Sequence, residues 1–417
     1  MTLQARPSPD WRPWLVWLLA ALTFTYAFVQ RVSPSVMIDS LMADLAVGGA
    51  VLGNLSAFYF YIYAGMQIPI GMMIDRYGPR RLLAPALLLA CGGSVLFAQA
   101  EAIETAYLAR LMIGLGVAFG YVGSLKLATN WFPARRFALL SGLTMTFGMA
   151  GGFLGQAPLA AVVEGSGWRD TLLLLGGVAL LLALLVWLIV RDRPAGIEED
   201  EASRQESPFA GLKRVVTNRQ NWLLALCSAA MTAPMLSMAG LWGVAWLMQS
   251  HGLARTEAAG ITSVMFLGWA LGSPAAGWAS DRFGRPKRLM QAAMLLGLLG
   301  MIALFYLPLP PALILPLMAV IGFNLGAMVT GFALARVSNP ISVTGAAYAF
   351  VNAAVTATGA LFQPLIGWLL DLNWSGEMAA GARIYDPEAY LIAFSVLPAF
   401  LAVAFAASLL IREEPSR

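Results

Sequence analysis

The chain has 417 residues, of which 59% are hydrophobic and only 12% are charged. Soluble domains carry roughly 25% charged residues, so this composition excludes a soluble globular protein and indicates a polytopic membrane protein. The net charge of +4 does not call for a nucleic-acid partner, because membrane topology accounts for where the basic residues fall. Cys91 and Cys227 both lie in apolar runs, so neither a disulfide framework nor a metal site is predicted.

Twelve stretches meet the criterion of ~20 mostly apolar residues for a membrane-crossing helix. Residues 1–13 lack the features of a signal peptide, so the first helix is expected to stay in the protein. The polar stretch 191–220, whose acidic run at 198–201 is interpreted as a solvated segment, is predicted to be a cytoplasmic linker between six-helix bundles at 1–190 and 221–417. The predicted helices are 14–37, 51–74, 82–99, 106–130, 137–163, 171–190, 221–248, 258–280, 289–307, 312–335, 342–370 and 389–411.

The basic residues are distributed unevenly between the two sides of the predicted membrane. With both termini in the cytoplasm, 20 of the 26 Lys and Arg fall on the cytoplasmic side, and only Arg169, Arg255 and Arg383 fall on the outer side. By the positive-inside rule, this asymmetry predicts a multi-pass protein of the cell inner membrane with both termini cytoplasmic.

A charged loop follows the second predicted helix and returns in the second half. Gly71-Met-Met-Ile-Asp75-Arg76-Tyr-Gly78-Pro-Arg80-Arg81 reappears 206 positions later as Gly277-Trp-Ala-Ser-Asp281-Arg282-Phe-Gly284. The same pattern at equivalent places in two halves indicates an internal duplication. A carboxylate at a helix end, with guanidinium groups beside it, can latch the ends of two bundles together. These residues are therefore predicted to act in gating.

The repeated loop resembles the signature Gly-x-x-x-Asp-Arg-x-Gly-x-Arg-Arg of the major facilitator superfamily. The resemblance covers essentially the whole chain and implies an all-α membrane protein with twelve transmembrane helices in two pseudo-symmetric six-helix bundles. Arg110, in the Arg-x-x-x-Gly pattern of the fourth helix, is similar to the superfamily's pattern there and joins the predicted gating residues; the alternative is that it snorkels to the outer surface. The Gly-Pro pair of antiporters is not met, because Pro158 stands three residues after Gly155.

The first helix, with Tyr26-Ala-Phe-Val-Gln30-Arg31-Val-Ser33-Pro34, resembles that of the superfamily's organic-anion branch, which includes sugar-phosphate exchangers and sugar-acid symporters. In that branch an arginine near this position binds the anionic group of the substrate. A guanidinium inside a membrane helix is expected to face a water-filled cavity, so Arg31 is the principal substrate-binding candidate. Lys126 is a second intramembrane cation. For both residues the alternative is snorkelling to a helix end.

The positions of the acidic residues indicate whether transport is coupled to protons. All 22 Asp and Glu fall in loops, tails or helix ends. The resemblance implies an Asp immediately before the arginine of the first helix in proton-coupled sugar-acid relatives, and this chain has Gln30 there. Because a proton relay normally needs an ionisable group in the membrane, the sequence favours anion exchange or facilitated flux. Asp39, Asp44 or the substrate itself are the alternative proton carriers.

Aromatic and neutral polar residues complete the predicted site. Each of them taken alone is better explained by helix packing. Together with Arg31 and Lys126, they predict a positive wall opposite an aromatic wall, which suits an organic acid with an apolar body. The residues are Tyr26, Gln30 and Tyr59 in the first half, and Trp242, Trp246, Asn324 and Asn352 in the second.

The sequence thus predicts a secondary active or facilitative transporter, not an enzyme, that moves a small organic anion, in the first instance a carboxylate, by alternating access. The pattern of ATP-driven pumps does not occur, and no cofactor is expected. The expected partners are the substrate, the lipid bilayer and a proton or counter-anion, with the protein as a monomer. Two alternatives stay open: an exporter of a metabolite, siderophore or drug, and a transport-inactive membrane sensor.

Overall fold

The computed structural model describes residues 11–133, 136–194, 208–340 and 343–412, and it is almost entirely helical. The acidic run of the predicted linker, at 198–201, lies outside the described residues. The first half contains α1 (Arg12–Val32), η1 (Ser33–Val36), α2 (Ile38–Leu45), α3 (Gly49–Gly65), α4 (Gln67–Tyr77), α5 (Pro79–Ala98), α6 (Ile103–Val117), α7 (Phe119–Trp131), α8 (Phe137–Leu154) and α9 (Ala157–Ile189). The second half contains α10 (Pro208–Thr217), α11 (Arg219–Pro234), the π-helical η4 (Met235–Trp242), α12 (Gly243–His251), α13 (Arg255–Phe283), α14 (Pro286–Tyr306), α15 (Pro311–Leu325), η5 (Gly326–Met328), α16 (Val329–Val337), α17 (Thr344–Leu372), β1 (Met378–Ala379), β2 (Ala382–Arg383), α18 (Pro387–Phe394) and α19 (Val396–Ser408).

The predicted membrane architecture is confirmed. Among the described residues, ten helical stretches are long and apolar enough to cross a membrane, or eleven if the bent pair α2–α3 is one span. One of the ten, Leu139–Ile189, is 51 residues long, and it folds back at Gly167, where φ is 82°, so it crosses twice. The second predicted helix is broken at Met66 into α3 and α4. With the α2–α3 pair as one span and Leu139–Ile189 as two, the described residues form the twelve crossings of the expected fold.

Proline sets several of the helix boundaries. Pro79, Pro286 and Pro387 stand in the first turn of α5, α14 and α18, where the missing N–H is not needed and the fixed φ suits a helix. Pro34 acts differently, because α1 ends at Val32 and continues as the short 3-10 helix η1. The first predicted helix, 14–37, is therefore not a continuous α-helix. The predicted outer loop after it also contains α2, which the sequence did not indicate.

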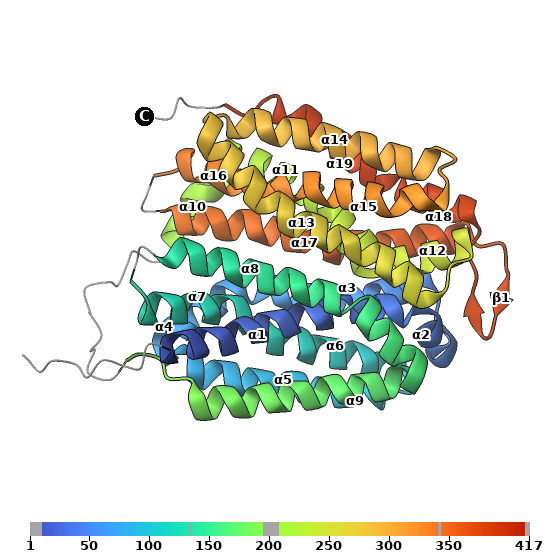
Figure 1. Ribbon diagram of the computed structural model, residues 1–417, viewed down its shortest axis with the longest axis horizontal. Coiled ribbons are helices and arrows are strands. Elements are labelled where there is room, and N and C mark those ends of the chain that lie inside the picture. The colour runs from blue at the N-terminus through green and yellow to red at the C-terminus, as the bar shows by residue number, and fades with distance from the viewer. Residues whose placement is uncertain (1–10, 134–135, 195–207, 341–342, 413–417) are drawn as a thin grey trace, which may run out of the picture.

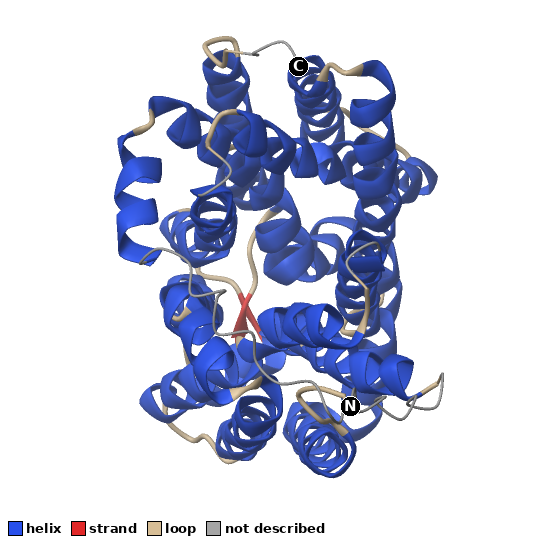
Figure 2. Cartoon of the chain, turned by 90° about the vertical axis from the view of Figure 1, so that its left-hand side faces the viewer, coloured by secondary structure: helices blue, strands red, loops and turns tan. Residues whose placement is uncertain are grey.

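The two halves lie side by side with their long helices running in the same general direction (Figure 1). The helices α1–α9 form the lower half of that view and α10–α19 form the upper half. Seen after a quarter turn, the helices appear largely end-on and again fall into two groups (Figure 2). Leu174, Leu181 and Leu188 on α9 are more than half exposed, as expected where helices face lipid rather than water.

The molecule has two distinct ends. The end at which α4 stops and α11 begins is called the linker face, and the opposite end, which carries α2 and the β1–β2 hairpin, is called the hairpin face (Figure 1). The polar contacts between the halves cluster toward the hairpin face. Arg255 donates to Val36 O at 2.8 Å and the backbone N–H of Thr256 donates to Glu164 at 3.2 Å, and the hairpin packs against α2. The halves are thus joined at the hairpin face.

Candidate functional site

Arg31 lies on α1, where four aromatic rings surround its guanidinium group. The carbon Cζ stands 4.2 Å from the centre of the Phe28 ring, 5.1 Å from that of Tyr63, and 5.6 Å from those of Tyr59 and Phe60. The residue is 8% exposed, and its Nε has no hydrogen-bond partner among the described residues. Rings, and no carboxylate of the described chain, therefore stabilise this charge.

A second buried cation lies beside the first. Arg110 on α6 is fully buried, and its Cζ stands 5.1 Å from the ring centre of Tyr59. Tyr59 thus contacts both guanidinium groups and donates its own hydroxyl proton to Ala27 O at 2.9 Å. Because Arg110 is completely covered, the snorkelling alternative does not hold for it. Arg110 was predicted to act in gating together with the repeated charged loop. In the structure it shares the Tyr59 ring with Arg31 instead.

The position of Arg110 follows from the proline in η1. An α-helical carbonyl accepts from the N–H four residues later, so Gln30 O would need an N–H at Pro34, which has none. Nη1 of Arg110 donates to Gln30 O at 2.9 Å, and the Ser33 hydroxyl donates to the same oxygen at 3.2 Å. Nε and Nη2 of Arg110 are buried without a partner in the described chain. Arg110 therefore completes the end of α1 and retains unused donors.

Gln30 and Tyr26, predicted as substrate ligands, face the interior of the first half. The Gln30 amide donates to the Tyr26 hydroxyl at 2.6 Å and to Ser94 on α5 at 2.8 Å. Both side chains are buried. Oε1 of Gln30 stays without a partner within the described ranges. This network joins α1 to α5 and supports the helix that carries Arg31.

Lys126 is not close to the two arginines. Its Nζ lies 2.6 Å from Asp75 Oδ1, so it contacts the charged loop at the linker face. The same loop is fixed to the end of α9, because the backbone N–H of Arg80 donates to Asp192 at 2.7 Å and its guanidinium donates to Trp187 O. The structure therefore brings the predicted substrate cation Lys126 together with the predicted gating residue Asp75.

The second copy of the charged loop differs from the first at its acidic residue. Asp281 and Arg282 end α13 and are exposed, and Gly284 closes the helix in the left-handed region, with φ of 61°. Within the described ranges, the side chain of Asp281 forms neither an ion pair nor a hydrogen bond. The position equivalent to Lys126 is Phe332, so the second copy lacks the basic partner of the first.

The predicted residues of the second half are dispersed. Trp242 donates to Gln363 O at 2.9 Å, and Trp246 packs edge-on against Phe305 and Phe394 inside its own half. The Asn324 amide donates to Val320 O on its own helix. Asn352 is half-buried on α17. Trp246 and Asn324 are thus engaged within the second half, whereas Trp242 lies in the π-helical segment that faces the first half.

Residues that the sequence reasoning missed form the contact between this site and the second half. The Phe60 ring, which covers Arg31, packs on Gly359 so closely that a Cβ there would lie 2.7 Å from it. Phe266 packs in the same way on Gly152, at 2.5 Å. Phe60 and Phe266 are 206 positions apart, the offset of the repeated loop. Extending that offset along the whole chain would have identified the pair.

The π-helical segment η4 forms a second contact with the first half. The Gln156 amide donates to Ala239 O in η4 at 2.6 Å and to Ser35 Oγ at 3.1 Å. Gln363 on α17 donates to Leu236 O, also in η4, at 2.7 Å. Such π-helical insertions are frequent at functional sites. The arginine cluster therefore lies beside a junction between the halves.

Comparison with known proteins places these features in a family. The family model described as Major Facilitator Superfamily matches residues 18–244 and 233–417. A protein of Cupriavidus necator named as a probable sulfoacetate transporter is 27% identical over 173 residues, 42% of this chain and 40% of that protein. A protein of Bacillus subtilis named as a probable galactarate/D-glucarate transporter is 24% identical over 308 residues, 64% of each chain. The chain thus spans less than two thirds of the length of these two relatives.

Solved structures show the same fold. A bacterial homolog of the human lysosomal transporter Spinster, in an inward-facing and occupied conformation, superposes with a TM-score of 0.80 at 18% identity, over 98% of this chain and 100% of that chain. The twelve crossings, the duplicated charged loop and the family match over nearly the whole length agree with one another. The chain belongs to the major facilitator superfamily.

Proposed function

We propose that this multi-pass membrane transporter moves a small organic anion, in the first instance a carboxylate, by alternating access between its two halves. Its superfamily consists of transporters, not enzymes. The observation that carries the proposal is the pair of buried guanidinium groups of Arg31 and Arg110, which share Tyr59 and form no ion pair within the described chain.

The energetics of the pair favour an anionic ligand. A cation–π contact contributes about 0.5–2 kcal/mol, whereas burial of an ion costs several kcal/mol even after the protein relaxes. The rings around Arg31 offset part of that cost and leave its edge, with the unpartnered Nε, for a ligand. A carboxylate matches the planar fork of a guanidinium. Binding of a carboxylate would therefore offset part of the remaining electrostatic penalty of the site.

The surroundings of Arg31 favour an anion with an apolar body. Its neighbours are the rings of Phe28, Tyr59, Phe60 and Tyr63, and the Tyr59 hydroxyl is already bonded to Ala27 O. Such a wall offers contact area but few hydrogen bonds to the hydroxyl groups of a sugar acid. The names of the two relatives, for sulfoacetate and for galactarate/D-glucarate, support the anionic class in general.

Lys126 has a different place in this proposal. Its ion pair with Asp75 at the linker face makes it a gating residue, together with Arg76, Arg80 and Arg81, which follow Asp75 in the charged loop. Coupling is proposed to be anion exchange or facilitated flux. Gln30 occupies the position of the expected acid, and it is a buried neutral amide bonded to Tyr26 and Ser94.

Thermal stabilisation of the purified protein tests the substrate class. A ligand that binds only the folded protein stabilises it by about 2.7 kcal/mol at a concentration of 100 Kd. We expect apolar carboxylates to raise the Tm of the wild type and to have no effect on Arg31→Gln. Arg169→Gln is the matched control, because that arginine pairs with Asp44 at the hairpin face and its loss should leave stabilisation intact.

Two results would count against the proposal. Equal stabilisation of wild type and Arg31→Gln by carboxylates would make Arg31 a structural residue. Stabilisation by neutral or cationic compounds alone would favour the exporter instead. Uptake of the hit compound into liposomes then separates a transporter from a sensor, which would bind without flux.

The orientation is a further part of the proposal. The excess of basic residues on the linker face supports a cytoplasmic linker face in the cell inner membrane, with both termini on that side. In a background of Cys91→Ala and Cys227→Ala, Ser375→Cys, at an exposed position between α17 and β1, should react with an impermeant thiol reagent on intact cells. Lys213→Cys, at an exposed position of α10, should react only after permeabilisation, and the reverse pattern would invert the orientation.

A further inference from the structure

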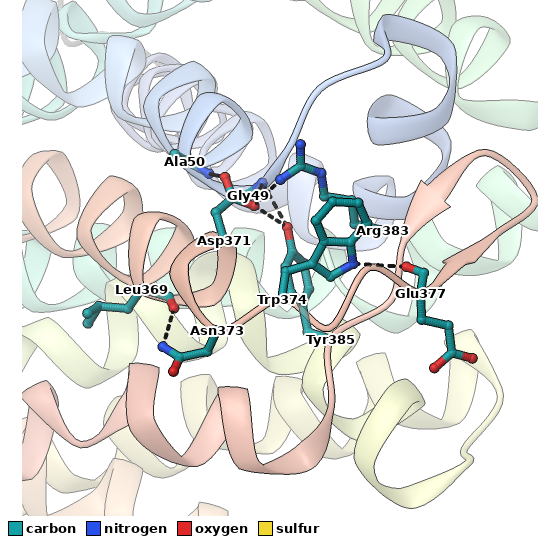
Figure 3. Close-up of polar contacts among 9 residues, drawn as sticks. All are labelled: Gly49, Ala50, Leu369, Asp371, Asn373, Trp374, Glu377, Arg383 and Tyr385. Carbon is teal, nitrogen blue, oxygen red and sulfur yellow. Dashed lines mark hydrogen bonds and ion pairs between the residues drawn. The ribbon is translucent and has the colours of Figure 1, made fainter.

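The N-terminus of α3 at the hairpin face is capped by a residue of the other half. The first N–H groups of a helix have no acceptor within the helix, and the N-cap position of α3 is Gly48, which has no side chain to provide one. Asp371, at the end of α17, accepts from the N–H of Gly49 at 2.9 Å and from that of Ala50 at 2.8 Å, with one carboxylate oxygen for each (Figure 3).

The same carboxylate is held by two residues that follow it in the chain. Tyr385 donates its hydroxyl to Asp371 Oδ1 at 2.6 Å, and Nη1 of Arg383 stands 3.0 Å from the same oxygen (Figure 3). Burial and the neighbouring Asp371 carboxylate raise the pKa of the Tyr385 phenol above its usual range, so the phenol stays a protonated donor. The Tyr385 oxygen in turn accepts from the Gly49 N–H at 2.9 Å.

Close backbone packing accompanies this cap. A Cβ on Gly49 would lie 2.8 Å from Gly367 O, and one on Gly48 would lie 2.8 Å from Asp371 Oδ2. Only glycine at both positions lets the start of α3 approach the end of α17 this closely. Arg383 also lies over the Trp374 ring, at 4.2 Å, which fixes the guanidinium on the side of the carboxylate.

We propose that Asp371 is the positioning residue of a latch that holds the hairpin face closed, by capping α3 across the boundary between the halves. The bonds to the N–H groups of Gly49 and Ala50 are lost together when the halves separate, because Asp371 and Tyr385 belong to one half and Gly49 and Ala50 to the other. The negative carboxylate also meets the positive end of the α3 dipole. The role of the latch rests on the proposed alternating access, but the contacts that form it do not depend on the substrate or on Arg31.

The test measures how often the hairpin face opens in the full-length purified protein. Ser35→Cys is the reporter, in the background without native cysteines, because Ser35 is 1% exposed and lines the contact between the halves with Ala245 and Arg255. Its rate of reaction with a hydrophilic maleimide reports the population open at this face. Loss of a hydrogen bond to a charged group shifts such an equilibrium by about tenfold or more, so Asp371→Asn should accelerate labelling by about that factor.

Asp44→Asn is the matched control. Asp44 is also a carboxylate at the hairpin face, but it accepts from Trp168 and Arg169 of its own half, so labelling should stay at the parent rate. Tyr385→Phe removes one donor with little change of volume, and it should accelerate labelling less than Asp371→Asn. The double variant should fall short of the product of the two single effects, because both act through one carboxylate.

Three results would overturn the latch. They are a labelling rate for Asp371→Asn within twofold of the parent, an equal acceleration by Asp44→Asn, and strict multiplication of the effects of Asp371→Asn and Tyr385→Phe. If Asp371→Asn does not yield folded protein, Tyr385→Phe alone still decides, since an unchanged rate there contradicts the proposal. Because no substrate is added, failure of the anion hypothesis leaves these outcomes unaffected.

Discussion

Arg31 and Arg110 carry the same charge and contact the same tyrosine, but only Arg110 bonds to the open carbonyl at the end of α1. Arg110 donates to Gln30 O, which Pro34 leaves without its helical partner. Removal of Arg110 would leave a buried carbonyl with only the weaker bond from Ser33. An unsatisfied buried group costs about 1–3 kcal/mol, so Arg110→Gln should lower the Tm, whereas Arg31→Gln should not.

Melting of the unliganded variants in detergent checks this difference between the two arginines. Arg31→Gln removes a buried charge that lacks an ion-pair partner in the described chain, so its Tm should match or exceed that of the parent. Ser33→Ala provides a second control, because it weakens the same carbonyl from the other side and should lower the Tm slightly. Equal losses for Arg31→Gln and Arg110→Gln would refute the division of roles.

Single residues also show the limit of what the sequence could predict. Arg31 stays a predicted substrate ligand, because a cation within an apolar helix has few explanations. Lys126 was predicted to lie with Arg31, but it forms an ion pair with Asp75, which is 51 positions earlier in the chain. The position of Lys126 along its own helix does not reveal this partner, because Asp75 belongs to another helix. Arg110 was grouped by its motif, and its true neighbour depends on a carbonyl that Pro34 leaves open in another helix.

At the scale of elements, glycines distinguish the two ends of the long helices. At the hairpin face, Gly49 and Gly53 on α3 pack against the backbone of α17. At the linker face, α4, which follows α3, carries Gly71, and the start of α17 carries Gly345. A Cβ at either position would meet no atom within 4 Å beyond its own stretch of helix. Gly142 on α8 and Gly277 on α13 have the same open space. We expect these four glycines to allow close helix approach when the linker face is closed.

Hydropathy predicted the long helices but not the elements that shape the contact between the halves. The π-helical segment η4 has its tertiary partners in Gln156 and Gln363, and the short helix α2 and the β1–β2 hairpin pack against each other. Their sequences have no period that separates them from an ordinary helix or loop. The duplication was visible in the repeated loop, and its 206-residue offset also relates Phe60 to Phe266.

For the whole molecule, closure of one face competes with closure of the other. In the proposed alternating access, rocking of the two halves about a central site opens one face as it closes the other. A substitution at one face should therefore change the population open at the opposite face. Gly71→Leu adds a side chain that meets nothing in the described state but would obstruct closure of the linker face. It should hold the hairpin face closed and slow the labelling of Ser35→Cys below the parent rate.

A double variant with Gly71→Leu and Asp371→Asn tests whether the two faces share one equilibrium. Asp371→Asn weakens closure at the hairpin face and Gly71→Leu weakens closure at the linker face, so their effects on one equilibrium should oppose each other. The double variant should label between the two single variants, near the parent rate, because free energies at distant sites add. Gly177→Leu is the control, since that glycine on α9 also has open space but belongs to neither closure. If Gly71→Leu leaves labelling unchanged in both backgrounds, the two faces are not linked through this equilibrium, and the glycines at the linker face have another purpose.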